Sequence, residues 1–239
     1  MPRLILIETS TALCSTALSE NDRIVCRRES TLPREHASKT AVFIKEMLDE
    51  CGWKVSDCDA VCVSSGPGSY TGLRVGSSSA KGLCFGSGLP LIAVGTLDVL
   101  AWQAVSEGLV PAGCKTIVPM IDARRMEVYS ATYRLEAAGS LLQPVRETDI
   151  APIVVDADSF KDLPATGPVL FIGDGAGKCR EVITSPNAVF AQECPNAVAM
   201  LAPALEAWKA ERFENTAYFE PFYLKDFVAT VSRKGLLLQ

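Results

Sequence analysis

Histidine and metal-binding cysteine pairs are nearly absent from this chain. Among its 239 residues there is one histidine, His36, and none of the nine cysteines stands in a Cys-x-x-Cys pair. Structural zinc sites are typically built from such pairs or from several histidines, so the sequence predicts no metal site. Nine cysteines cannot all pair within one chain, and we expect reduced, mostly buried thiols.

Long hydrophobic runs and an excess of positive charge are also missing. The apolar run near the N-terminus ends at Glu8 and is too short for a signal peptide or a membrane span. Lys and Arg number 23 against 28 Asp and Glu, which gives a net charge of −5. This balance argues against a protein that binds nucleic acid by itself, although it leaves room for a local basic patch. We expect a cytoplasmic protein with no membrane partner.

The order of apolar strands and amphipathic helices predicts two α/β lobes. A three-strand meander starts at Leu4 and is followed by a helix over 35–51, a strand "DAVCVSS", a helix to about Gly86, a strand "PLIAVG" and a helix from Thr96. A second apolar strand, "TIVPMID", ends in an acidic residue and a tight turn, as the first strand does. We therefore expect the order βββαβα twice, with mixed sheets.

A glycine-rich stretch, "SSGPGSYTGLRVG" (64–76), joins a predicted strand to a helix. Ser69 or Thr71 can cap this helix, whose N-terminus could attract an anion. Gly72, Gly76 and Ala80 follow at intervals of four, although glycine inside a helix costs about 1 kcal/mol relative to alanine. Such a bare face predicts the close approach of another backbone, either from the protein itself or from a partner helix.

The helix over 35–51 offers a second candidate surface. Helical spacing predicts an inward face, which would consist of Ala37, Ala41, Ile44, Leu48 and Cys51. Phe43 and Met47 lie one turn apart beside that face, and we expect them to be partly exposed as a docking strip. The alternative is that Phe43 packs inside.

Several motifs together resemble one family. "IETS", "REHASK", "SSGPGSYTGLRVG", "AKGLCFGSGLPLIAVGTLDVLA", "IDARRMEVY" and "PFYLK" occur in this order and resemble the TsaB (YeaZ) family, relatives of TsaD. The resemblance implies an actin-like ATPase (ASKHA, ribonuclease H-like) fold. It divides the chain into a first lobe over 1–100, a degenerate second lobe over 101–220, and a tail over 221–239 that packs on the body through Pro221 and Tyr223.

The resemblance also implies a function and its partners. Family members support TsaD, which places a threonylcarbamoyl group on the adenosine beside the tRNA anticodon. They are regarded as non-catalytic, pair with TsaD or with themselves through the two helices of the first lobe, and are joined by the ATPase TsaE. tRNA would be contacted only indirectly. The partner-binding residues are then expected to be His36, Thr40, Phe43, Met47, Gly72, Leu73, Gly76, Ala80 and Leu83.

An ATPase or ATP-dependent phosphotransferase of the actin-like superfamily is the alternative function. Those enzymes place an aspartate where this chain has Glu8, so the longer side chain weakens the case for a metal site. "GDGAGKC" is not a P-loop, because Ile172 replaces the first glycine and Cys179 the final hydroxyl. A weak ATP or ADP site at the lobe or subunit interface is still possible, and its candidates are Glu8, Thr9, Ser10, Asp122, Gly173 and Gly175.

The residues at positions 36 and 40 argue against peptidase activity. TsaD-type enzymes carry two metal-binding histidines four residues apart, and here the pair is broken because Thr40 follows His36. We assign no catalytic residue and expect His36 to cap the helix or to be exposed. Arg74 is expected to be exposed, with an acidic group or the partner as its possible contact. Asp122 is expected to form a buried pair with Arg124 or Arg125.

Overall fold

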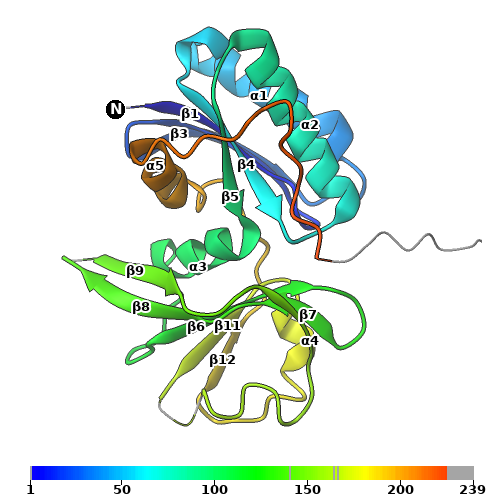
Figure 1. The fold of residues 1–239 in the computed structure, drawn as a ribbon, viewed down its shortest axis with the longest axis vertical. Helices are drawn as coiled ribbons and strands as arrows, with labels where there is room; N and C mark the ends of the chain where they lie inside the picture. The colour runs from blue at the N-terminus through cyan, green and yellow to red at the C-terminus, as the bar shows by residue number, and fades with distance from the viewer. Residues whose placement is uncertain (1, 140, 164, 166, 225–239) are drawn as a thin grey trace, which may run out of the picture.

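Two lobes, each built on one sheet, make up the protein (Figure 1). The computed structural model describes residues 2–139, 141–163, 165 and 167–224. Helix α3 (Thr96–Ser106) lies between the lobes. The expected two-lobed α/β architecture with mixed sheets is confirmed.

The first lobe contains a five-stranded sheet in the order β3-β2-β1-β4-β5. Strands β1, β2 and β3 form the predicted antiparallel meander, whereas β4 and β5 run parallel to β1 because helices cross over between them. The strands span Arg3–Glu8 (β1), Cys14–Glu20 (β2), Arg23–Ser30 (β3), Ala60–Gly66 (β4) and Leu91–Gly95 (β5).

Helices cover both faces of this sheet. Helices α1 (His36–Cys51) and α2 (Tyr70–Ser87) lie side by side on one face, and α5 (Leu201–Lys209) lies on the other (Figure 1). The alternation along β1 explains both layers, since Ile5 packs towards α1 and α2 while Leu6 packs towards α5. The short helix η1 (Val55–Asp57) precedes β4.

The second lobe departs from the expected repeat. Its β8–β9 hairpin pairs with β6, and α4 is only four residues long. The chain leaves α4 through Val182, Ile183 and Thr184, and β-branched residues followed by a proline do not favour a longer helix. The elements are β6 (Thr116–Asp122), β7 (Glu127–Ser130), β8 (Tyr133–Ala138), β9 (Leu141–Arg146), β10 (Ala151–Val154), β11 (Val169–Ile172), α4 (Ala176–Cys179) and β12 (Ala188–Ala191).

The chain returns to the first lobe after β12. Helix α5 packs on the first-lobe sheet, and the segment that follows it, 213–224, crosses α2 (Figure 1). Lys81 of α2 donates hydrogen bonds to the carbonyl oxygens of Ala217 and Phe219. We call residues 213–224 the strap. The division of the chain at residue 100 falls inside α3 and stays a prediction.

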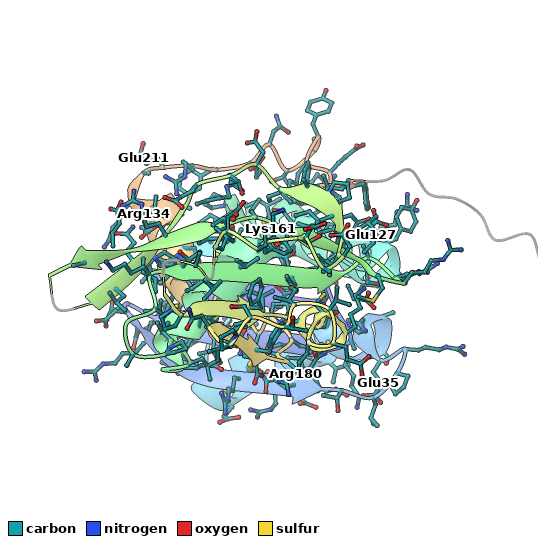
Figure 2. All side chains as sticks on the ribbon, turned by 90° about the horizontal axis from the view of Figure 1, so that it is seen from below. Glu35, Glu127, Arg134, Lys161, Arg180 and Glu211 are labelled. Atoms are coloured by element: carbon teal, nitrogen blue, oxygen red, sulfur yellow. The ribbon has the colours of Figure 1, made fainter. Side chains whose placement is uncertain are left out.

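Apolar side chains make up most of the buried core, and the charged side chains lie mainly at the surface. Of the charged side chains labelled in Figure 2, four are exposed (Arg134, Lys161, Arg180 and Glu211) and two are half-buried (Glu35 and Glu127). Seven cysteines are buried and two are half-buried, all without a disulfide, which confirms that the thiols behave as small hydrophobic groups. No helix in the described part of the chain is both long and apolar enough to cross a membrane.

Candidate functional site

The glycine face of α2 lies against the protein's own first strand. A Cβ atom on Gly72 would be 2.0 Å from the carbonyl oxygen of Thr9, and one on Gly76 would be 2.3 Å from the Thr9 Oγ1. That hydroxyl donates a hydrogen bond of 2.8 Å to the carbonyl of Gly72. The glycines therefore let α2 approach the end of β1, and the interpretation that they receive a partner helix is not supported.

The other predicted contact residues of α2 also face the interior of the protein. Leu73 and Ala80 are fully buried, and Leu83 packs against the core between the sheet and the two helices. The predicted cap is confirmed, because Ser69 Oγ accepts from the backbone N–H of Gly72 at 3.3 Å.

The orientation expected for α1 is wrong in part, since Ile44 and Leu48 are buried as expected and the alternative, that Phe43 packs inside, is confirmed. Phe43 and Met47 are buried, at 9% and 0% exposure, while Ala37 and Ala41 face the solvent. Rotating the helix in this way buries the two large apolar side chains in exchange for two methyl groups, which favours folding by a larger hydrophobic term. The docking strip of Phe43 and Met47 does not exist on this surface.

His36 connects the start of α1 to the β1–β2 loop, and Thr40 bonds back to it within the helix. The Nε2 of the half-buried His36 lies 3.0 Å from the carbonyl oxygen of Thr11, and Thr40 Oγ1 donates to the carbonyl of His36 at 2.7 Å. Among the described residues, no group of three or more His, Cys, Asp or Glu could hold a metal ion.

The solvent side of α2 carries a second row of small and apolar residues. Thr71, Val75, Ser78, Gly82 and Phe85 follow one another at intervals of four and three, which places them on one helical face. Phe85 is 90% exposed. We call these five residues the outer face. The spacing of these five residues can be seen in the sequence, but the spacing of Gly72, Gly76 and Ala80 on the same helix is more regular and was interpreted instead.

A groove lies beside the outer face, between α1 and α2. Its volume is about 520 Å³, and its lining consists of Ala37, Tyr70, Thr71, Arg74, Val75, Ser78 and Ser79. The guanidinium of Arg74 lies 4.1 Å above the ring of Tyr70, and a hydrogen bond with Tyr223 raises the pKa of Arg74. Arg74 is exposed, as expected, and its contacts are aromatic.

The first-lobe candidates for a nucleotide site are enclosed. Glu8, Thr9 and Ser10 are each 0% exposed. The Glu8 Oε1 accepts a hydrogen bond of 2.6 Å from the Ser10 N–H, whereas Oε2 has no partner among the described residues. Burial raises the pKa of Glu8 from its ordinary value of 4.5 to about 7, against the opposing effect of the Ser10 hydrogen bonds.

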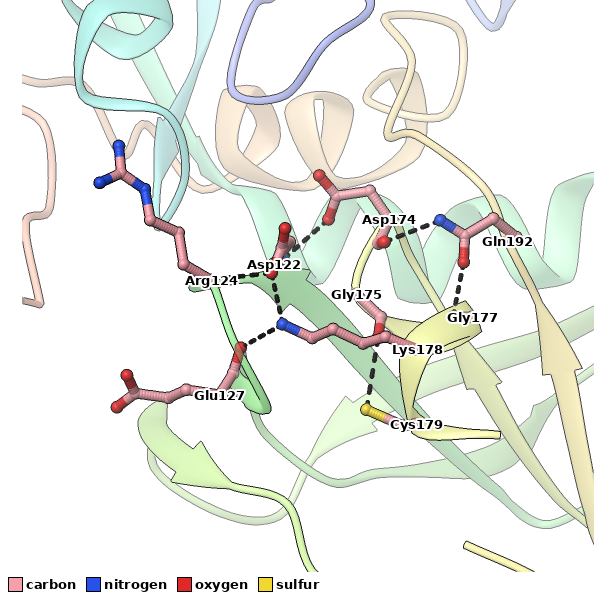
Figure 3. A network of polar contacts seen from close by, with 9 residues as sticks. All are labelled: Asp122, Arg124, Glu127, Asp174, Gly175, Gly177, Lys178, Cys179 and Gln192. Atoms are coloured by element: carbon pink, nitrogen blue, oxygen red, sulfur yellow. Dashed lines mark hydrogen bonds and ion pairs between the residues drawn. The ribbon is translucent and has the colours of Figure 1, made fainter. Parts of the chain in front are cut away.

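The corresponding strand end of the second lobe is open. Asp122 is exposed and forms an ion pair with Lys178, whose ammonium also donates to the carbonyl of Glu127 at 2.6 Å (Figure 3). The expected buried pair of Asp122 with an arginine is wrong. Arg124 and Arg125 adopt left-handed backbone angles, with φ of 72° and 51°, and both are exposed.

Gly173 and Gly175 have a packing role that the sequence did not reveal. A Cβ on Gly173, where φ is 136°, would lie 2.1 Å from the carbonyl oxygen of Met120, and one on Gly175 would lie 3.1 Å from the Asp122 nitrogen. Between them, Asp174 accepts from the Asp122 N–H at 2.9 Å (Figure 3), and burial raises its pKa to about 6. This loop fastens α4 to β6.

Comparison with known proteins gives one consistent family. A family model described as TsaD, tRNA N6-adenosine threonylcarbamoyltransferase, matches residues 30–232. The tRNA threonylcarbamoyladenosine biosynthesis protein TsaB of Escherichia coli is 30% identical over 95% of this chain and 96% of its own length. The TsaB of Bacillus subtilis is also 30% identical, over 75% of this chain and 74% of its own.

Solved structures agree with the sequence relatives. YeaZ from Pseudomonas aeruginosa superposes with a TM-score of 0.81 at 28% identity, covering 94% of this chain and all of that one. With the strand order of the first lobe, this match confirms the expected actin-like α/β fold. The chain belongs to the TsaB (YeaZ) family.

Proposed function

We propose that this protein acts in tRNA threonylcarbamoyladenosine biosynthesis as a non-catalytic partner of a TsaD-type enzyme. The names of its relatives and the TsaD family model support the pathway. The observation that carries the partner role is the outer face of α2, where a 90% exposed phenylalanine ends a row of small residues. Helices α1 and α2 form the binding surface, to which α2 contributes the side opposite to Gly72 and Gly76.

The chemistry of this surface suits a helical partner. Only two residues of α2 carry a charge, Arg74 and Lys81, and neither belongs to the outer face. Small residues at Ser78 and Gly82 allow close approach of another helix, and intervals of four and three are those at which two helices keep one seam in contact. Phe85 supplies a large aromatic group, a residue type that is enriched in the cores of protein interfaces.

The same surface supports competing assemblies. A second copy of the chain can bind through its own α1 and α2, so that self-association and binding to the TsaD-type enzyme exclude one another. A TsaE-type ATPase joins the heteromeric assembly, in the cytoplasm. The net charge of −5 favours an indirect contact with tRNA, through the other subunits.

We propose no catalytic role because of the acidic residues that end β1 and β6, which are Glu8 and Asp122. The Glu8 carboxyl is enclosed, and the Asp122 carboxylate is paired with Lys178. An actin-like ATPase needs both acidic positions to face a nucleotide and its metal. Turnover of ATP by the purified chain alone, lost in Glu8→Ala, would establish the alternative function instead.

Weak binding of ATP or ADP at the lobe interface is a separate part of the proposal. Arg124 supplies positive charge near the open end of β6, and Lys178 would add to it by exchanging its Asp122 partner for a phosphate, whereas Glu8 and Ser10 are not accessible. Calorimetric titration with ADP should give a dissociation constant that is weakened at least fivefold, on the order of 1 kcal/mol, in Lys178→Ala. Equal binding by both proteins would place the nucleotide elsewhere.

The partner role is tested by direct binding. The purified chain is titrated with the TsaD-type enzyme of the same organism, and complex formation is followed by size-exclusion chromatography with light scattering. Ser78→Arg places a long charged side chain on the outer face and should abolish the complex, whereas Val154→Arg, at a 68% exposed position of the second lobe, should not. Equal binding by both variants would contradict the proposed surface.

A further inference from the structure

Arg74 lies in the groove between α1 and α2, beside two aromatic rings. Its guanidinium is 4.1 Å above the ring of Tyr70, and it forms a hydrogen bond with Tyr223, whose ring lies 5.1 Å from that of Tyr70. Tyr223 therefore ties the chain to the body, as expected, while the rest of the predicted tail, 225–239, lies outside the described residues. Because the two tyrosines restrict the guanidinium, less conformational entropy is lost when it binds a further group.

Arg74 is exposed and forms no ion pair with an Asp or Glu among the described residues. The hydrogen bond with Tyr223 is the largest effect on the pKa of Arg74, and it raises that pKa, whereas the carboxylate of Glu220 in the strap acts more weakly than either tyrosine. A guanidinium carries five N–H donors and binds a carboxylate through two of them at once. Arg74 is therefore held in place and still able to bind an acidic group.

The groove lies at the N-terminal ends of both helices. Its lining includes Ala37 from the first turn of α1 and Tyr70 and Arg74 from the first two turns of α2. A helix N-terminus carries a partial positive charge, which adds to that of Arg74. The carboxylate of Glu35, the N-cap of α1, accepts a hydrogen bond of 2.5 Å from Ser30. The acidic residues within α1 lie in its C-terminal half and pair with Arg28 or Lys45; they are Glu46, Asp49 and Glu50.

This distribution of charge distinguishes two possible occupants of the surface. Any helix that covers the groove removes water from Arg74, which is unfavourable unless the helix supplies an anionic group. A second copy of this chain supplies none from its own binding helices, because α2 contains no Asp or Glu and the acidic residues within α1 are already paired. Charge complementarity therefore favours a different chain that carries a carboxylate.

We propose that Arg74 determines which partner docks on α1 and α2. It selects a helix of the TsaD-type enzyme that places an Asp or Glu side chain over the groove, and it disfavours a second copy of this chain. The inference rests on the proposed function and adds the chemistry of the partner at the same surface. The outer face offers contact to either occupant, whereas Arg74 discriminates between them by leaving one with an unpaired buried charge.

Zero-length crosslinking in the complex tests the contact. In Arg74→Lys, a carbodiimide activates a carboxyl group, the amine at position 74 attacks it, and an amide forms as the urea leaves. Peptide mapping by mass spectrometry should join position 74 to an Asp or Glu of the TsaD-type enzyme. Arg27→Lys is the control, because Arg27 is exposed on β3 and does not line the groove. Crosslinks of position 74 only within its own chain, or none although the complex forms, would overturn the proposal.

A neutral variant tests the discrimination. Arg74→Met removes the charge and keeps an unbranched side chain. Its affinity for the TsaD-type enzyme should fall about tenfold, and its self-association should tighten about threefold, since only the first assembly loses a charge pair. Arg27→Met should change either constant by less than about twofold. Sedimentation analysis measures both equilibria. A change of both in the same direction, or an unaltered affinity for the enzyme, would refute selection by Arg74.

The outcomes separate this inference from the proposed function. A complex that Ser78→Arg abolishes and Arg74→Met leaves unchanged would sustain the proposed function and refute the role of Arg74. Failure of the wild-type chain to bind the TsaD-type enzyme at all would refute the proposed function, and the inference about its partner would fall with it.

Discussion

The two sides of α2 are both built from small residues, yet they have opposite roles. On the inner side, Gly72 and Gly76 touch Thr9, and a methyl group at either position would overlap with it. On the outer side, a Cβ on Gly82 would meet nothing within 4 Å. A row of small residues on a helix therefore does not by itself indicate a docking surface. What lies opposite the row decides whether it serves the fold or a partner.

The inner side should give the largest effect. Gly72→Ala forces a methyl group against the backbone of Thr9, which cannot move away as a flexible side chain would. We expect a loss of about 3 kcal/mol or more in the free energy of unfolding, measured by urea denaturation. Gly76→Leu, one turn away, should also destabilise the monomer rather than only weaken association. A native-like stability of Gly72→Ala would mean that α2 does not lie so close to β1.

Glu8, at the end of β1, should make the free energy of unfolding depend on pH by up to about 3 kcal/mol. Folded Glu8 keeps its proton up to a pKa of about 7, whereas the unfolded chain loses it near 4.5, so stability falls as the pH rises through this window. Glu8→Gln removes this loss. The variant should therefore gain stability over the wild type from pH 4.5 to 7, and the gain should level off above pH 7.

The control for this titration is the corresponding strand end of the second lobe. Asp122→Asn removes an exposed ion pair with Lys178 and should change stability by less than about 1 kcal/mol. Both variants are compared with the wild type by thermal unfolding across the pH range. A pH-independent difference between Glu8→Gln and the wild type would show that this carboxyl ionises normally in the folded protein.

The outer side should affect association and leave the fold intact. Phe85→Ala removes a 90% exposed ring, so the melting temperature should change little. If the ring anchors a partner, the dissociation constant for the TsaD-type enzyme should rise about 30-fold, which corresponds to about 2 kcal/mol. Isothermal titration calorimetry measures this change, and an unaltered affinity would remove Phe85 from the proposed interface.

The smallest effect should come from Gly82→Ala, the matched counterpart of Gly72→Ala. The position is interior to α2 and open to solvent, so the added methyl group only improves helix propensity. We expect a gain of about 1 kcal/mol in the free energy of unfolding. Opposite signs for the two Gly→Ala changes would sharpen the contrast between the two sides, whereas a loss at Gly82 would place a neighbour there.

Local patterns were sufficient for much of the first lobe. The meander, the helix ending at Gly52 and the cap at Ser69 follow from strand alternation, from a left-handed glycine and from a hydroxyl at the N-cap. The second lobe was predicted less well. The β8–β9 hairpin and the short α4 replace elements that a repeat of the first lobe would contain.

The candidate site was predicted at the level of elements but not of side chains. Helices α1 and α2 lie together on one face of the sheet, as expected. The side that each helix exposes to solvent differs from the side that the sequence predicted. Period-3.6 spacing allows two choices on α1, because the set with Ala37 and the set with Phe43 both form a stripe. The larger burial of Phe43 and Met47 selects the second.

The sequence by itself determined the family, the order of strands and helices in the first lobe, and the broken histidine pair at His36 and Thr40. Only the tertiary structure decided that Gly72 and Gly76 face Thr9 and that Glu8 is enclosed while Asp122 is open. The physical reason is that helical and strand periodicities depend on residues near in sequence, whereas the direction that a face points depends on which distant backbone approaches it. Thr9 and Gly72 are 63 residues apart and share one hydrogen bond, a contact that no local pattern specifies.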